Sequence, residues 1–355
     1  MKSNYEPIGN FIQEIKVRNA DLKAKKLLGI NIDKFFMPSV ANVVGTDLSV
    51  YKVVQKNQFA CNRMHIGRDY RIPIALTQSE EPFMVSPAYD VFEIIDTEVL
   101  LPEFLMMWFS RSEFDRETAY YTDADVRGGL TWQSFLEMKF PVPKIETQRA
   151  IVAEYNALQN RININQKIIQ KLEETAQAIY KEWFVDNRDE EWEVGILSDF
   201  VEIKYGKAYS HLKKGKIPLY GSGGIMGSVS ESLYDKTSVL IPRKGTLNNI
   251  MYINKPFWTV DTMFYSILLN VYAGYYVFLF LKQHDFSSLD QGSAVPSMTT
   301  NYLNAMEILI PDNKVLKKFD NIMNSLFETQ EIYKRENQKL NEFKTLLLSK
   351  LASVK

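Results

Sequence analysis

The chain repeats part of its own sequence at a constant interval. Pro143 corresponds to Pro311, and residues 170–174 correspond in the same frame to residues 338–342, with four of five residues identical. Self-similarity at a fixed interval is the signature of a duplicated structural unit. We therefore expect the 355 residues to fold as two similar halves, each large enough for a domain of ordinary size.

The segment that follows each of the two prolines has the heptad pattern of a coiled coil. Its apolar positions alternate in steps of four and three, and neither segment contains Gly or Pro. We expect two helices of about 38 residues, roughly 55–60 Å long, that pair with each other in antiparallel fashion. The coiled-coil and partner-docking positions are predicted at Ile151, Leu158, Ile162, Leu172, Ile179, Trp183, Leu326, Leu340 and Leu347. Ordinary amphipathic helices packed on their own domains are the alternative, but these would not recur in frame.

Outside the helices, both halves have the pattern of a mixed, mostly β domain. Residues 89–95 and 263–269 are β-rich, and each stretch is followed by an apolar helix, at 102–109 and 274–281. The predicted fold class is therefore α+β, with two similar mixed α/β domains joined by two long antiparallel coiled-coil helices. The predicted boundaries are 1–143 for the first domain, 144–185 for the first helix, 186–311 for the second domain and 312–355 for the second helix.

The composition restricts where such a chain can work. It is 46% hydrophobic and 24% charged, which is typical of a folded globular protein. The single cysteine, Cys61, cannot form an internal disulfide, as expected for the reducing cytoplasm. The most apolar run, residues 266–281, falls short of the roughly 20 residues needed to cross a bilayer. We expect a buried helix there, no membrane contact and a cytoplasmic protein.

The sequence offers little evidence of catalysis. It lacks a Gly-rich phosphate loop ending in Lys-Ser/Thr, and it lacks the Asn/Asp-Pro-Pro-aromatic tetrapeptide of an amino-methyltransferase. His65, His211 and His284 stand apart, without the spacing of metal ligands. We therefore predict no catalytic residue, no metal site and no cofactor on this chain. Asp199 and Glu202 remain the positions for an alternative, a small metal-dependent nuclease.

Local clusters of basic and amide side chains favour nucleic acid, although the net charge is only −1. Residues 203–230 and 236–260 contain no acidic residue, and residues 62–71 contain three Arg and one His. DNA recognition needs cations for phosphates, and Arg, Asn or Gln for base edges. A solvated turn with scattered charge explains any one cluster, but the three together favour DNA. The predicted DNA-binding residues are Arg63, Arg68, Arg71 and Arg127 in the first half, and Lys207, Tyr220, Ser222, Arg243, Lys244 and Asn248 in the second.

One further segment is rich in glycine. Residues 221–227 do not have the glycine spacing of a dinucleotide-binding fingerprint. We expect a flexible loop whose backbone amides can approach a phosphate or a base closely.

The motifs around the first helix resemble those of a known family. Over essentially its whole length, the chain resembles the specificity subunits of type I restriction–modification enzymes. The motifs that carry the resemblance are Phe-Pro-Val-Pro at 140–143, Gln-Arg-Ala-Ile-Val at 148–152, Trp183-Phe184, Trp192, the loop 292–297 and Pro311. One departure is Leu316, where the pattern of the first helix has Gln148.

The resemblance implies a non-catalytic subunit with two target recognition domains. Each would read one half of a split double-stranded DNA site, and the helices would set the gap between the half-sites. Two methyltransferase (modification) subunits would dock on the helices, joined in some complexes by restriction or translocase subunits. S-adenosylmethionine, ATP and Mg would be bound by those partners. The other alternative left open is a coiled-coil scaffold carrying two protein-binding domains.

Overall fold

The computed structural model describes residues 5–41, 43–64, 66–122, 129–286 and 298–354. The chain divides into two compact units. Unit 1 comprises Met1–Ile164 and Glu336–Lys355, and unit 2 comprises Asn165–Arg335. Two long helices, α5 (Ile145–Lys181) and α8 (Asn313–Lys350), each contribute one segment to each unit.

Unit 1 is built around a four-stranded antiparallel sheet with the strand order β2-β9-β6-β7. Its strands are β2 (Ile12–Ile15), β9 (Asp90–Ile94), β6 (Phe59–Cys61) and β7 (Ile74–Leu76). Three antiparallel pairs surround it: β1 (Tyr5–Pro7) with β10 (Lys139–Pro141), β3 (Leu28–Ile30) with β4 (Phe36–Pro38), and β5 (Lys52–Val54) with β8 (Phe83–Val85). The short helices are α1 (Ile66–Asp69), α2 (Pro102–Phe109), α3 (Ser112–Tyr120) and α4 (Trp132–Glu137).

The core of unit 1 lies between this sheet and the helices. The rings of Phe59 and Phe92 stack with centroids 4.9 Å apart, and Phe109 of α2 meets both edge-on. Helix α2 begins at a proline, whose fixed φ suits the first turn, and buries most of its apolar residues. The C-terminal end of α8 joins the same core, where Leu351 is buried.

Unit 2 contains a sheet with the equivalent strand order, β12-β18-β15-β16. Its strands are β12 (Val201–Tyr205), β18 (Met263–Leu268), β15 (Ser238–Pro242) and β16 (Met251–Ile253), all antiparallel. A second sheet has the order β14-β13-β17, and β11 (Glu193–Ile196) pairs with β19 (Glu307–Ile310). The remaining elements are β13 (Lys214–Gly221), β14 (Gly224–Val229), β17 (Trp258–Thr259), α6 (Gly274–Lys282) and α7 (Thr300–Asn304).

Backbone hydrogen bonds confirm the predicted duplication. The Ile8 amide donates to the Met138 carbonyl in the first half, and the Leu197 amide donates to the Met306 carbonyl in the second. Likewise, the Ile95 amide donates to Phe11, and the Leu269 amide donates to Phe200, both at 2.9 Å. Helices α5 and α8 begin at positions 145 and 313, so each starts at the same distance after its proline, Pro143 or Pro311.

The two halves differ beside this shared framework. Strand β8 pairs antiparallel with β5, whereas β17 pairs parallel with the longer β13. The loop predicted at residues 221–227 is in fact a tight turn, because β14 already begins at Gly224, which has a positive φ of 112°. The prediction of a flexible loop was wrong for this reason: glycine here permits a turn between two paired strands.

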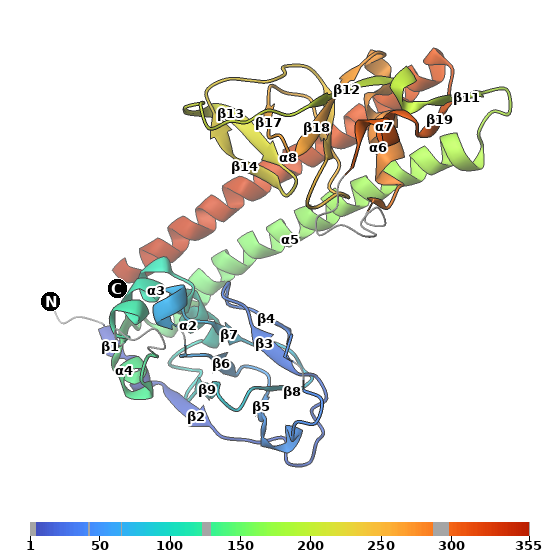
Figure 1. The fold of residues 1–355 in the computed structure, drawn as a ribbon. Coiled ribbons are helices and arrows are strands. Elements are labelled where there is room, and N and C mark those ends of the chain that lie inside the picture. Colours follow the sequence, from blue (N-terminus) through green and yellow to red (C-terminus); the bar gives the residue numbers. More distant parts are fainter. Residues whose placement is uncertain (1–4, 42, 65, 123–128, 287–297, 355) are drawn as a thin grey trace. The chain divides into compact units, whose positions relative to one another are not determined.

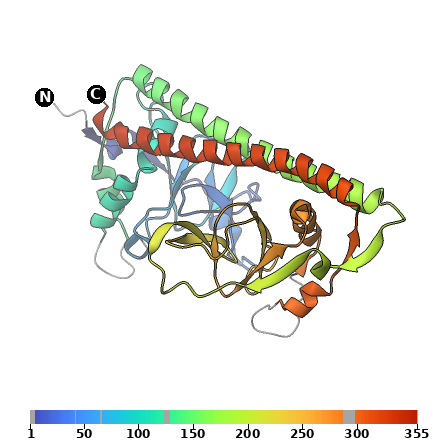
Figure 2. The ribbon, with the colours of Figure 1, turned by 90° about the horizontal axis from the view of Figure 1, so that it is seen from above.

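Helices α5 and α8 pair in opposite directions, as the fold class predicted. In unit 1, Arg161 Nε lies 2.8 Å from Glu336 Oε1, and Lys344 lies over the ring of Tyr155. In unit 2, the rings of Tyr180 and Phe319 contact each other. Within each unit, the segments of the two helices therefore lie side by side and run antiparallel (Figures 1 and 2). Every residue predicted for the coiled-coil positions is buried or half-buried.

One polar contact of α5 has no equivalent at the same position of α8. The Gln148 amide is fully buried; it donates to the carbonyls of Val99 and Pro143 and accepts from the Leu101 amide. Leu316, its counterpart in the repeat, is instead packed in an apolar cluster. The beginning of α5 is therefore fixed to its domain by hydrogen bonds, and the beginning of α8 by apolar packing.

The apolar run at residues 266–281 was predicted to form a buried helix. It comprises the end of β18, a short turn and most of α6, in which every residue from Gly274 to Leu281 is buried. Among the residues that the structure describes, no helix is long and apolar enough to cross a membrane.

Candidate nucleic-acid interface

Four loops of unit 2 are tied together by hydrogen bonds. We call residues 205–209, 221–224, 243–249 and 259–262 the second-half loop cluster. The Lys207 amide donates to Thr259 and the Arg243 amide donates to Thr262, both at 2.9 Å. The Asn249 side-chain amide donates to the Ser222 carbonyl at 2.8 Å. Loops from both sheets of the unit therefore form one connected surface.

Gly206 allows two loops of this cluster, residues 205–209 and 259–262, to approach each other closely. A Cβ atom at this position would lie 2.0 Å from the Val260 carbonyl oxygen and 2.7 Å from that of Thr259. Real side chains cannot occupy such a space without moving the backbone, so the loop after β12 can lie against the loop before β18 only because residue 206 is a glycine.

The cations of the cluster are the predicted residues Lys207, Arg243 and Lys244. Lys207 and Lys244 are exposed, and Arg243 is half-buried. The guanidinium of Arg243 lies over the ring of Tyr205, 5.5 Å from its centroid, and donates to the Asp261 carbonyl at 3.4 Å. Tyr205 itself is 51% exposed. Cations beside an exposed aromatic ring are suited to contact phosphates and bases.

The other three predicted residues of the second half have structural contacts. The Tyr220 side chain is buried, and this burial raises its pKa. Asn248 donates to Asp285 and accepts from the Phe286 amide, both at 2.7 Å. The Ser222 side chain is half-buried, and its Oγ would lie 2.7 Å from a Cβ at Gly245. These contacts favour a role in shaping the loops.

In the first half, Arg63 lies at the end of the central strand β6. Its Nε is 2.5 Å from Asp90 Oδ2, its Nη1 donates to the Leu130 carbonyl, and its guanidinium lies over the Trp132 ring. The side chain is 20% exposed. The charge of Arg63 and two of its N–H groups are therefore directed at its own domain.

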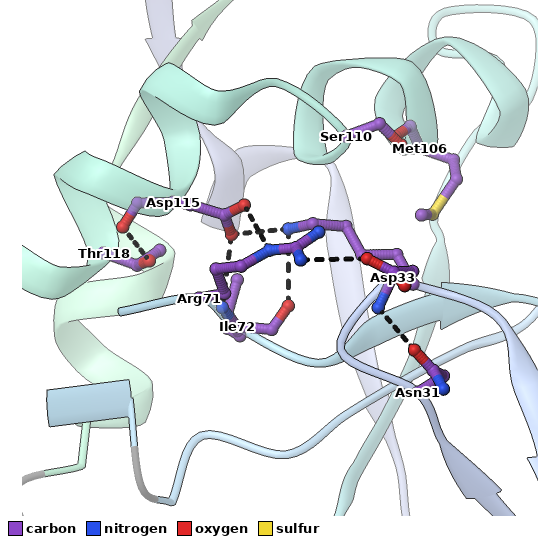
Figure 3. A network of polar contacts seen from close by, with 9 residues as sticks. Asn31, Asp33, Arg71, Ile72, Met106, Ser110, Asp115 and Thr118 are labelled. Atoms are coloured by element: carbon purple, nitrogen blue, oxygen red, sulfur yellow. Dashed lines mark hydrogen bonds and ion pairs between the residues drawn. The ribbon is translucent and has the colours of Figure 1, made fainter. Parts of the chain in front are cut away.

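Arg71 belongs to a second polar network (Figure 3). Its Nη1 lies 2.9 Å from Asp33 Oδ1, and its Nε lies 3.6 Å from Asp115 Oδ2. Asp115 also accepts from the Ile72 amide and from Lys34, whose ammonium donates to the Ile72 carbonyl. A buried ion pair thus holds both backbone groups of the residue that follows Arg71. Burial lowers the pKa of Lys34.

Two predicted residues cannot be placed. The side chain of Arg68 and all of Arg127 lie outside the described residues, as does the loop 292–297. The acidic partners Asp90 and Asp115 were missed by the sequence analysis, because each lies on a different element from its arginine, far along the chain, and no local pattern connects them.

The carboxylates considered for a nuclease also have structural contacts. Asp199 accepts a hydrogen bond from the Ile196 amide at 2.8 Å, and Glu202 forms an ion pair with Lys204. Within the described parts of the chain, no group of three or more His, Cys, Asp or Glu side chains is arranged to hold a metal ion. Cys61 is fully buried, which raises the pKa of its thiol.

A family model matches the second half of the chain. Residues 189–342 match the model for the type I restriction modification DNA specificity domain. This range contains the second sheet framework, the loop cluster and most of α8, and the same framework recurs in the first half. The comparison thus relates the second half of the chain to the DNA specificity domain of type I restriction–modification systems.

Curated specificity subunits are similar to parts of the chain. The specificity subunit of the type I restriction enzyme HindI from Haemophilus influenzae is 27% identical over 192 residues, which is 52% of this chain and 40% of that protein. The specificity subunit of MjaIX from Methanocaldococcus jannaschii is 23% identical over 285 residues, 64% of each chain. The matched region thus spans less than two thirds of either relative.

Solved structures share the fold over nearly the whole length of this chain. The S subunit of a type I restriction–modification system from M. genitalium superposes with a TM-score of 0.64, at 15% identity, and the match covers 98% of this chain and 95% of that one. A chain from a type I R-M system, solved to explain complex assembly and conformational transition, gives a TM-score of 0.51 at 16% identity, covering 98% and 96%. At these identities the likeness concerns the fold.

Proposed function

We propose that this chain is a specificity subunit, which recognises double-stranded DNA for a type I restriction–modification complex. Residues 1–143 would read one half of a split site and residues 186–311 the other. The observation that carries the proposal is the duplicated sheet framework, whose two copies present loops of different chemistry. Two copies of one framework with different loops are suited to read two different half-sites, because the framework positions the loops and the loop side chains select the bases.

The chemistry of the complex is assigned in this proposal to partner subunits. Two methyltransferase subunits would dock on α5 and α8, and restriction or translocase subunits would join where a system includes them. S-adenosylmethionine, ATP and Mg would be held by these partners, in the cytoplasm. This specificity subunit would then act without a catalytic residue of its own. The half-buried apolar positions along both helices support docking of this kind.

Single-molecule methylation mapping of plasmid DNA tests the proposal. The DNA would come from cells that express this chain with a type I methyltransferase subunit, and from cells that express the methyltransferase alone. We expect one new split motif, methylated in each half, only when this chain is present. Co-purification of the two proteins without any motif would contradict DNA reading and favour a protein scaffold.

A pair of variants would connect the motif to the second-half loop cluster. The double substitution Lys207→Ala and Lys244→Ala removes two exposed cations of the cluster, and we expect weaker methylation of the motif. The double substitution Lys236→Ala and Lys255→Ala is the matched control, because it also removes two exposed cations but both lie outside the cluster. Equal effects of both variants would show that the loss depends on charge alone and not on the cluster.

A further inference from the structure

Arg63 and Arg243 occupy the same position of the duplicated framework. The equivalent bonds from Ile95 to Phe11 and from Leu269 to Phe200 align β9 with β18, which makes Asp90 equivalent to Phe264. Cys61 pairs with Asp90, and Ile241 pairs with Phe264. Arg63 lies two residues after Cys61, and Arg243 lies two residues after Ile241.

A second backbone contact supports this equivalence independently. The Leu130 amide donates to the Arg63 carbonyl at 3.2 Å, and the Met298 amide donates to the Arg243 carbonyl at 2.9 Å. Leu130 and Met298 are themselves counterparts in the sequence repeat, in the same frame as Pro143 and Pro311. The two arginines therefore occupy equivalent backbone positions, and their side chains can be compared directly.

The side-chain surroundings of the two arginines differ. Arg63 has the carboxylate of Asp90 at 2.5 Å, whereas the position equivalent to Asp90 beside Arg243 is occupied by Phe264. Among the described residues, Arg243 forms no ion pair within 4 Å, and its guanidinium contacts only the Tyr205 ring and the Asp261 carbonyl. In the described part of the chain, the positive charge of Arg63 is therefore compensated by a carboxylate, and that of Arg243 is not.

We infer that the two equivalent arginines have different roles: Arg243 contacts DNA directly, whereas Arg63 is a positioning residue. This inference rests on the proposed function. Arg63 links β6 and β9 through Asp90 and holds the backbone at Leu130, and so fixes the junction at which the loops of the first half begin. Arg243 offers a guanidinium that has no carboxylate partner among the described residues. This group recognises phosphates and guanine edges through charge-assisted hydrogen bonds.

The test measures DNA binding as a function of salt concentration. The full chain, in complex with the methyltransferase subunit, is titrated with a duplex carrying the mapped site and with duplexes in which the first or the second half-site is scrambled. The variants are Arg243→Gln, Arg63→Gln, Asp90→Asn and the double variant of Arg63 and Asp90. Melting temperatures confirm that each variant is folded.

For Arg243→Gln we expect one of two signatures of a lost contact. If the guanidinium binds a phosphate, the slope of log K against log salt falls by about one for all duplexes. If it reads a guanine edge, affinity falls about 10- to 100-fold only for duplexes with an intact second half-site. Binding that is unchanged on every duplex would contradict the assignment of Arg243.

For Arg63→Gln we expect an unchanged salt slope and weaker discrimination of the first half-site alone. Asp90→Asn should have the same effect, and the double variant should be no worse than either single one, because all three break one link. The positioning role would be overturned if Arg63→Gln lowered the salt slope as Arg243→Gln does. It would also be overturned if the losses in discrimination caused by Arg63→Gln and Asp90→Asn added up in the double variant. If the wild-type complex bound the intact and the scrambled duplexes with equal affinity, the result would contradict the proposed function, and with it this inference.

Discussion

Several side chains that the sequence presents as free cations are held by carboxylates of the same unit. Arg63 contacts Asp90, and Arg71 contacts Asp33 and Asp115. The sequence indicates where basic residues cluster, because local composition is enough for that. It does not indicate which of them are compensated, because the partners come from other strands and helices. For this reason the cluster at residues 62–71 could be predicted, but the use of each arginine could not.

The ion pair of Lys34 and Asp115 gives a prediction about stability. Their side chains are only 3% and 9% exposed, and the ammonium lies 2.6 Å from the carboxylate. Asp115→Asn leaves a buried, uncompensated lysine, and we expect the free energy of unfolding to fall by about 3–5 kcal/mol. Urea denaturation, followed by a spectroscopic signal that reports on unit 1, measures this loss in the free energy of unfolding.

A double variant and a pH series serve as controls. Replacing Lys34 by Met and Asp115 by Leu removes both charges, so it should cost less than Asp115→Asn alone. Burial already lowers the pKa of Lys34, and without Asp115 that pKa should fall further. The unfolded chain then binds more protons than the folded one, so the deficit of Asp115→Asn should shrink as the pH rises toward 10.5, the ordinary pKa of lysine. A deficit independent of pH would contradict a buried charge as its cause.

At the scale of elements, periodicity was the most reliable guide. The heptad pattern predicted both long helices, and the observed starts at residues 145 and 313 preserve the interval of the repeat. Apolar runs bounded by turns also located β9, β18, α2 and α6. The short strands β3 and β4 were missed, because segments of three residues are too short to show a period. Strand β14 was missed because its glycines and exposed residues have the composition of a loop.

Gly206 tests whether the second-half loop cluster acts as one surface. Gly206→Ala places a Cβ atom against the Val260 carbonyl, so the two loops must separate. We expect a loss of about 1–3 kcal/mol in stability, together with weaker binding to duplexes that keep only the second half-site. Gly227→Ala is the matched control, because Gly227 lies outside the cluster and a Cβ there would meet nothing within 4 Å. Equal binding by the two variants would contradict a shared surface.

At the scale of the molecule, unit 1 combines two segments that lie far apart in the sequence. The Tyr5 hydroxyl donates to the Ala352 carbonyl at 2.9 Å, and Leu347, Leu348 and Leu351 contribute to the core around Phe59. The sequence repeat predicted two similar halves, but a repeat cannot show which helix segment completes which core. The predicted antiparallel pairing is confirmed, but the repeat does not show that the units divide between residues 164 and 165 and between residues 335 and 336.

Removing residues 336–355 should therefore weaken the domain formed by the first half of the sequence. We expect residues 5–143 to become more sensitive to limited proteolysis, because the buried face of α5 in unit 1 loses its helical partner. Unit 2 keeps all its residues, and its fragments should stay protected. Mass spectrometry of the fragments distinguishes the two, and uniform sensitivity of both units would contradict this division.

The same division has a consequence for how the protein is made. Unit 2 is one continuous stretch of chain and can fold as soon as it leaves the ribosome, whereas unit 1 is begun first and lacks its share of α8 until residues 336–355 have been synthesised. At about 5–20 residues per second, the newly made N-terminal domain waits on the order of 10–40 s for the segment that covers its apolar surface. During that interval its uncovered apolar surface makes the new domain prone to aggregation.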